Sequence, residues 1–264
     1  MSIPQHTHAT HEHSTPPPEQ IPAEEQIRYF TNEELTAHIP DLSTLITEDD
    51  TPVDNLFSAK QQRLLVETLH GNVELWNPSR RSFVVDANVG IFPVPKNTPL
   101  VPDVFLSMDV LTDDIGSIHT TRAYFAWVYG KMPELVIEIV SNRKGGEMER
   151  KHREYARQHI PYYAVFDPMR ELRGEIFQLF ALYHGAYTPL QDFWMEDLNL
   201  GLRLWHGVYE GEETTWLRWC DAHGTLIPTT AESRDYEKQR AEQERQRAER
   251  LAEQLRRLGI TPDV

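Results

Sequence analysis

The sequence is short of cysteine, of basic residues and of long apolar runs, and each shortage excludes a class of protein. One cysteine among 264 residues, Cys220, excludes an internal disulfide framework and a zinc site built on several thiolates. Such sparing use of cysteine is typical of the reducing cytoplasm, where we expect the protein. No apolar run approaches the roughly 20 residues that cross a bilayer. Residues 1–22 lack the apolar segment of a secretory signal.

Basic residues are outnumbered, since 26 Lys and Arg against 41 Asp and Glu give a net charge of −15. An acidic chain argues against nucleic-acid binding, because cationic side chains must displace counterions from the phosphates. The charge is uneven, however. Residues 141–160 hold six basic and three acidic side chains and therefore carry +3, whereas the remainder of the chain carries −18. An anionic substrate is therefore expected at this segment.

Composition divides the chain into three parts. Residues 1–27 are rich in His, Pro, Thr and Glu without periodicity, which predicts a disordered tail. Residues 28–230 contain the apolar segments of a folded domain. Residues 231–264 change abruptly to Glu, Gln, Arg and Ala in a helical pattern and are neutral overall.

The middle part switches between helical and strand periodicity. In chain order it predicts a helix over 58–71, strands over 83–91, 101–108 and 134–141, a helix over 147–159, a strand over 162–168 and a hairpin over 174–191. Ser58 is the expected N-cap of the first helix, and Gly71 its expected end. The hairpin turn is expected at His184-Gly185. This order indicates an α/β or α+β fold with helices on a central sheet.

The C-terminal segment has a thin heptad pattern. Ala241, Ala248 and Leu255 repeat every seven residues, as do Leu251 and Leu258. Two interpretations stay open: a coiled coil through which two copies dimerise, and a solvent-exposed helix held by charge pairs. Either one gives the tail a structural or interaction role.

Glu138 is the residue that points to chemistry. It lies inside the apolar run ELVIEIVS, where an ionised carboxylate costs several kcal/mol unless it is paired or binds a metal. A salt bridge to a nearby arginine at a strand end is the alternative. Asp103 also begins an apolar strand, so the two carboxylates converge if those strands are neighbours. Two hard oxygen ligands suit Mg²⁺ or Mn²⁺.

Three stretches resemble the Uma2-like family of restriction endonucleases, which belongs to the PD-(D/E)XK nuclease superfamily. They are PDVFLSMDV from residue 102, PELVIEIVSN from residue 133 and GGEMERKHREYARQHIPYYAVFDP from residue 145. The resemblance runs from roughly Phe30 to Leu204. It implies a restriction-endonuclease-like core, with a mixed central sheet flanked by helices and followed by the charged C-terminal helix.

The resemblance also implies positions. Asp103 matches the Asp of the PD element and Glu138 the acid of the (D/E)XK element, and both hold the metal together with the backbone carbonyl of Ile139. The superfamily's lysine should stand at position 140, where this chain has Val140. In the Uma2-like family the lysine instead comes from the following helix, which supplies Lys151.

Other residues are weaker candidates. Lys144 and Lys131 are less well placed candidates for the role of the superfamily's lysine. Glu67 is a third acid on the preceding helix, for which a surface position is the favoured interpretation. Tyr155 is expected to pack and to be within hydrogen-bonding reach of the site.

Two functions follow as hypotheses. The first is a Mg²⁺- or Mn²⁺-dependent endonuclease that hydrolyses phosphodiester bonds of DNA, with Asp103, Glu138 and Lys151 as catalytic residues. The metal would polarise a phosphodiester oxygen and activate a water, and Lys151 would stabilise the developing charge. The second is a catalytically inactive binding or scaffold protein of the same fold, which self-associates through its C-terminal helix. The acidic composition and the displaced lysine favour the second hypothesis.

Overall fold

The computed structural model describes residues 55–95, 98–110, 122–141 and 147–257. The predicted N-terminal tail, Lys144 and Leu258 lie outside these ranges. The helices are α2 (Leu56–Gly71), α3 (Val73–Trp76), α4 (Ala126–Tyr129), α5 (Glu147–Arg157), α6 (Thr230–Arg257) and the 3-10 helix η3 (Glu196–Leu198). The strands are β1 (Phe83–Ala87), β2 (Gly90–Phe92), β3 (Val104–Met108), β4 (Ala123–Phe125), β5 (Leu135–Ile139), β6 (Tyr162–Phe166), β7 (Phe177–Tyr183), β8 (Ala186–Pro189), β9 (Trp194–Met195), β10 (Leu200–Tyr209) and β11 (Glu212–Cys220).

A six-stranded mixed sheet forms the centre, in the order β1-β3-β5-β6-β7-β8. Only β5 and β6 are parallel neighbours, and α5 connects them. Strands β3, β5 and β6 are buried along their whole length, as expected for a sheet covered on both faces. The fold class predicted from the sequence is confirmed.

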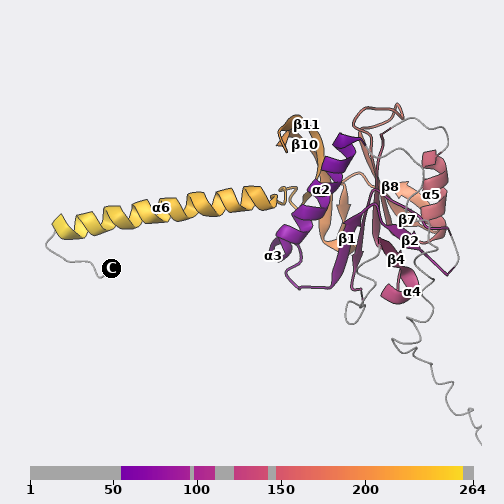
Figure 1. Ribbon diagram of the computed structural model, residues 1–264, viewed down its shortest axis with the longest axis horizontal. Coiled ribbons are helices and arrows are strands. Elements are labelled where there is room, and N and C mark those ends of the chain that lie inside the picture. Colours follow the sequence, from indigo (N-terminus) through magenta and orange to yellow (C-terminus); the bar gives the residue numbers. More distant parts are fainter. Residues whose placement is uncertain (1–54, 96–97, 111–121, 142–146, 258–264) are drawn as a thin grey trace, which may run out of the picture.

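Helices cover the two faces of this sheet, α2 on one side and α5 on the other (Figure 1). Alternate residues of β5 enter two apolar clusters. Leu135 and Ile137 pack in the same cluster as Leu65 of α2. Val136 packs in the other cluster, with Tyr155 of α5. Glu138 follows the parity of Val136, so its side chain faces α5.

The predicted first helix is observed, but it begins earlier than expected. The Asn55 side chain caps α2 by accepting a hydrogen bond from the Ser58 backbone N–H at 2.8 Å, so Ser58 is not the N-cap. The helix ends at Gly71 as predicted. A Cβ at Gly71 would overlap the Thr230 hydroxyl, so the absence of a side chain lets the start of α6 approach α2.

The strand predicted over 83–91 is two strands. Asn88 adopts a left-handed backbone with φ 54°, and the chain turns there between β1 and β2. Strand β2 then leaves the central sheet and pairs with β4 in parallel. The turn places the Asn88 backbone N–H 3.2 Å from the Asp103 carbonyl oxygen. The hairpin predicted over 174–191 is observed as β7 and β8, with His184 and Gly185 both at positive φ in its turn.

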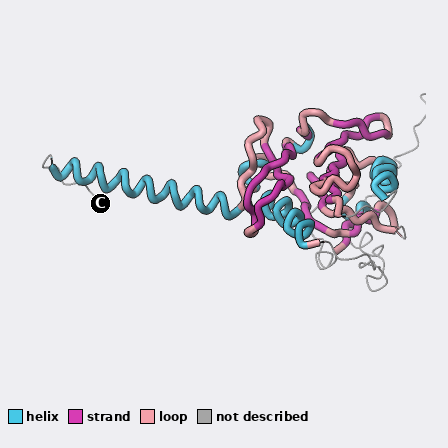
Figure 2. Tube along the Cα trace, turned by 90° about the horizontal axis from the view of Figure 1, so that it is seen from above, coloured by secondary structure: helices cyan, strands magenta, loops and turns pink. Residues whose placement is uncertain are grey.

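Helix α6 leaves the body of the molecule as a single long rod (Figure 1, Figure 2). None of its 28 residues is buried. Ion pairs along the helix join Arg240 to Glu244, Arg245 to Glu242 and Arg257 to Glu253. Such pairs occur both on a solvent-exposed helix and on the outer positions of a coiled coil, so both interpretations of the C-terminal segment stay predictions. Among the described residues, no helix is both long and apolar enough to cross a membrane.

The first turn of α6 is fixed to the body by Glu232. Its carboxylate accepts hydrogen bonds from the Arg218 guanidinium at 2.5 and 2.9 Å and from the Thr229 backbone N–H at 2.7 Å. The Glu232 N–H donates to the Thr229 hydroxyl, which completes a capping box. Arg218 is 3% exposed, so its charge depends on this partner. Burial raises the pKa of Glu232, but the Arg218 and Thr229 hydrogen bonds outweigh it and the pKa lies below its usual value.

The Glu232→Gln substitution keeps the capping box and removes the charge. We expect a loss of about 1–2 kcal/mol in the free energy of unfolding at pH 7, because a buried cation loses its ionised partner. Since the folded-state pKa of Glu232 is lowered, the stabilisation exists above the unfolded pKa of about 4.3 and disappears as the pH falls through the folded value. Urea denaturation of both proteins at pH 7 and pH 3 measures this, and a difference that stays constant with pH would contradict it. Glu249→Gln, which alters an exposed pair at 3.8 Å, is the control and should change stability by less than about 0.5 kcal/mol.

Candidate active site

Glu138 lies on β5, and Asp103 directly precedes the neighbouring antiparallel strand β3. The register of β3 and β5 pairs Val104 with Ile137, so one further step sets Asp103 across from Glu138 on the same face. The two carboxylates that the sequence singled out are therefore brought together at the end of β5. Glu138 is 3% exposed, and Asp103 is half-buried.

Both oxygens of the Asp103 carboxylate accept hydrogen bonds from the protein. Oδ2 accepts from the backbone N–H of Ile139 at 2.6 Å, and Oδ1 accepts from the Gln62 side-chain amide at 3.2 Å. In an extended strand the N–H and C=O of one residue point to the same side. The Ile139 carbonyl is therefore expected on the same side of β5 as its N–H, and its place as a metal ligand stays a prediction.

Both oxygens of the Glu138 carboxylate accept hydrogen bonds from α5. The Lys151 ammonium donates to Oε2 at 2.7 Å, and the Tyr155 hydroxyl donates to Oε1 at 2.6 Å. Lys151 and Tyr155 are four residues apart, so both lie on the helix face that meets the sheet. The Lys151 side chain is 22% exposed and reaches Glu138 from the solvent side. The predicted lysine and the predicted acid are thus in direct contact.

Tyr155 is a permanent hydrogen-bond donor. Its ring is fully buried, and the pKa of its hydroxyl is raised well above the usual value, first by burial and then by the charge of Glu138 and the hydrogen bond to it. The neighbouring Tyr163 ring lies 5.4 Å away between centroids. Its hydroxyl is buried and has no hydrogen-bond partner among the described residues. These two neighbouring tyrosines of the same cluster thus differ in their hydroxyl contacts, because only the Tyr155 hydroxyl has a described bond to the acid.

Val140 stands where the superfamily pattern predicts a lysine. Its side chain is buried in the apolar cluster on the α5 side, and its N–H donates to the Phe166 carbonyl of β6. A lysine at this position would bury its ammonium among apolar side chains, at a cost of several kcal/mol. Lys151 avoids this cost because it reaches the same carboxylate from the helix.

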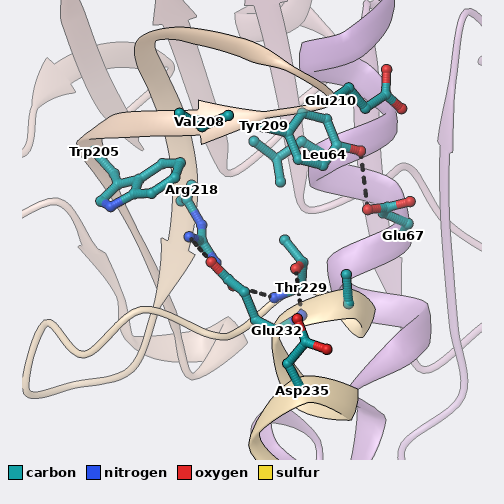
Figure 3. Close-up of a pocket in the computed structure, with 11 residues that line it drawn as sticks. Leu64, Glu67, Trp205, Val208, Tyr209, Glu210, Arg218, Thr229, Glu232 and Asp235 are labelled. Carbon is teal, nitrogen blue, oxygen red and sulfur yellow. Dashed lines mark hydrogen bonds and ion pairs between the residues drawn. The ribbon is translucent and has the colours of Figure 1, made fainter.

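The rival residues lie elsewhere. Lys131 contacts Glu134 and donates to the Met108 carbonyl at 2.9 Å. Glu67 accepts a hydrogen bond from the Tyr209 hydroxyl at 3.0 Å and lines a hollow of about 350 Å³ at the root of α6 (Figure 3). The residues that line this hollow include none of the predicted site residues. The surface interpretation of Glu67 therefore agrees with the structure.

Sequence reasoning missed two side chains of the site. Gln62 of α2 is 4% exposed, and its amide lies 3.4 Å from the Asn88 side-chain oxygen. Asn88 in turn donates to the Gln62 side-chain oxygen at 2.9 Å. The signal was available, because Gln62 lies four residues after Ser58 and seven before Leu69, on the buried stripe of the helix. An amide on such a stripe needs polar partners.

The donor set fits a hard divalent cation. The register of β3 and β5 sets Asp103 across from Glu138, and Mg²⁺ or Mn²⁺ prefers carboxylate oxygens as ligands. The described residues contain no cluster of three or more His, Cys, Asp or Glu side chains that could hold a metal. A site with two protein carboxylates suits an ion that keeps several waters.

The Tyr155–Glu138 contact predicts a stability difference between two tyrosine variants. Tyr155→Phe removes a donor to a buried carboxylate and should lower the free energy of unfolding by about 2 kcal/mol. Tyr163→Phe removes a hydroxyl without a described partner, so we expect no loss or a small gain. Chemical denaturation of both variants tests this. An equal loss in the two variants would mean that the hydrogen bond is not what Tyr155 contributes.

A comparison with protein-family models matches residues 29–200 to Uma2, a family described as "Putative restriction endonuclease". The comparison with curated proteins gives no match. The matched region spans well over half of the chain, from before α2 to the start of β10, and it includes every residue of the site described above. The chain therefore belongs to the Uma2 family.

Proposed function

We propose that this protein is a divalent-metal-dependent endonuclease that hydrolyses DNA phosphodiester bonds. Asp103, Glu138 and the Ile139 carbonyl would hold Mg²⁺ or Mn²⁺, and Lys151 would act beside them. The observation that carries the proposal is the juxtaposition of Asp103, Glu138 and Lys151 from three separate elements at one end of β5. The family description supports the nuclease class.

When bound, the metal would polarise a phosphate oxygen and lower the pKa of a coordinated water. The chain's own residues prepare the site for this chemistry. The Ile139 N–H and the Gln62 amide orient Asp103, and Tyr155 and Lys151 orient Glu138. The Lys151 ammonium forms an ion pair with Glu138 at 2.7 Å. A phosphate group brought to this carboxylate would therefore also contact the Lys151 ammonium.

Local charge supports an anionic substrate at this place. Helix α5 also carries Arg150, Arg153 and Arg157, all with exposed side chains. Cationic side chains on one face favour encounter with the DNA backbone even when the whole chain is acidic. We place the activity in the cytoplasm, because the single cysteine, Cys220, is consistent with a reducing compartment.

Two substitutions that keep side-chain shape test the proposal. Asp103→Asn and Glu138→Gln should lower cleavage of plasmid DNA in Mg²⁺ or Mn²⁺ by at least about 100-fold, because loss of a ligand costs more than loss of an outer partner. Lys151→Gln should lower cleavage by about 100-fold or more. Asp109→Asn is the matched control, since Asp109 follows β3 as Asp103 precedes it and pairs with Arg81 on the surface.

Circular dichroism shows whether each variant is folded, and the gel assay then separates the outcomes. The control should cleave within about twofold of the unmodified chain. Cleavage that persists in both Asp103→Asn and Glu138→Gln would place the activity elsewhere or in a contaminant, and it would overturn the proposal.

The second candidate is a catalytically inactive scaffold that self-associates as a homodimeric coiled coil through α6. The observation in its favour is the exposed apolar side of α6, where Leu251 is 51% exposed. A chain that ends after Arg240 loses the heptad positions but keeps Glu232 and Ser233, which fix the helix to the body. Sedimentation analysis should show a dimer for the full chain and a monomer for the shortened chain. A monomer in both cases would contradict dimerisation through α6.

A further inference from the structure

Helix α2 carries two adjacent buried glutamines whose side chains bond to different partners. Gln61 is 0% and Gln62 4% exposed. The Gln61 amide donates to the Leu217 carbonyl at 2.8 Å and accepts from the Leu217 N–H at 2.9 Å. Gln61 thus joins α2 to the backbone of β11. The two bonds satisfy the hydrogen-bonding groups of the buried Gln61 amide. Neither bond involves a residue of the candidate site.

The Gln62 amide instead bonds to side chains of the candidate site. Its nitrogen lies 3.2 Å from the Asp103 Oδ1 and 3.4 Å from the Asn88 side-chain oxygen, and its oxygen accepts from the Asn88 amide at 2.9 Å. The Asn88 N–H also lies 3.2 Å from the Asp103 carbonyl oxygen. Three elements therefore meet at Asp103: α2 through Gln62, the turn after β1 through Asn88, and β5 through Ile139.

These contacts fix the plane of the Asp103 carboxylate. Ile139 of β5 donates to Oδ2, and Gln62 of α2 donates to Oδ1. A carboxylate held at both oxygens by donors from two different elements cannot rotate freely about its terminal bond. A metal ligand needs such an arrangement, because outer partners that orient a ligand strongly affect metal affinity.

Asn88 is suited to this position by its backbone. It adopts φ 54°, a left-handed conformation that asparagine tolerates better than most residues. The tight turn presents its amide to Gln62 while the residue as a whole stays exposed. The amide pair thus joins a buried helix residue to a surface turn, and both of its members also bond to Asp103, Gln62 to the carboxylate and Asn88 to the backbone carbonyl.

We infer that Gln62, with Asn88, is a positioning residue that holds the Asp103 carboxylate in the orientation required for the divalent metal. This inference rests on the proposed function, because it assigns a role toward the metal of that site. It adds α2 and the turn after β1 to the site.

Direct titration with Mn²⁺, followed by the electron paramagnetic resonance signal of free Mn²⁺, tests the inference without reference to cleavage. Gln62→Met keeps the volume and removes the amide, and it should weaken Mn²⁺ binding by about 10-fold or more. Gln61→Met is the matched control. It should lower the melting temperature by losing its bonds to Leu217, yet bind Mn²⁺ within about twofold of the unmodified chain.

Asn88→Gly is the second variant, and it guards against misfolding of Gln62→Met. Glycine accepts the left-handed backbone, so this exposed substitution should leave stability nearly unchanged. We expect it to weaken Mn²⁺ binding by about threefold, because the Gln62 amide loses its partner.

The outcomes separate the inference from the proposed function. Normal Mn²⁺ binding by Gln62→Met and Asn88→Gly, together with loss of binding in Asp103→Asn, would overturn the inference and leave the metal site standing. Equal Mn²⁺ binding by Asp103→Asn and the unmodified chain would overturn both. Weaker binding in Gln61→Met to the same extent as in Gln62→Met would reduce the role of Gln62 to general stability and would overturn the inference.

Discussion

The buried carboxylate of Glu138 is the constraint on which the packing of α5 against the central sheet depends. A carboxylate that is 3% exposed in the middle of an apolar strand is costly unless donors surround it. Lys151 and Tyr155 supply two of them from α5, and Tyr155 is the fully buried apolar anchor of that otherwise highly charged helix. The same contacts therefore attach α5 to the sheet and assemble the candidate site. Stability and chemistry are coupled here, so a change at Glu138 is expected to affect both.

Much of this arrangement could be predicted from the sequence because it breaks a local rule. Glu138 interrupts a run of Val, Ile and Leu, and Asp103 precedes another apolar run. Both acids therefore stand out as charged residues in segments that are expected to be buried. The central sheet followed from the same continuous apolar runs. Lys151 required the family resemblance, because no pattern in a helix rich in Lys and Arg distinguishes one lysine from its neighbours. The roles of these three residues toward a metal stay a prediction.

The remainder could not be predicted because it depends on contacts between segments far apart in the chain. Gln62 and Asp103 are 41 residues apart, and a glutamine beside a buried stripe is a weak signal until its partner is known. The turn at Asn88 was missed because residues 83–91 read as one alternating strand, although Asn88 has a positive φ and the chain leaves the central sheet there. The long hairpin of β10 and β11 was not predicted, since its two strands mix Gly, Arg and Thr with aromatic residues in no clean alternation.

Residues 1–54 hold eleven acidic residues and one arginine, so they carry −10 of the net charge of −15 and lie outside the described residues. Acidic side chains gather around the hollow at the root of α6, where Glu67, Glu210, Glu232 and Asp235 line one small volume (Figure 3). The exposed arginines of α5 lie on the opposite face of the sheet from α2 (Figure 1). Arg63 and Arg218 pair with two of the acidic side chains of the hollow, Glu210 and Glu232. Among the described residues, the arginines of α5 are therefore where a polyanion is expected to be attracted.

The fixed first turn of α6 has a mechanical consequence. Arg218, Thr229 and Asn72 hold the start of the helix through Glu232 and Ser233, so the body of the molecule, rather than a flexible linker, sets the direction in which the rod points. At 1.5 Å per residue, 28 helical residues extend for about 40 Å. A molecule bound at the far end of α6 would therefore be held at a defined distance and direction from Glu138. A small rotation of the first turn of α6 would move that end over a large distance.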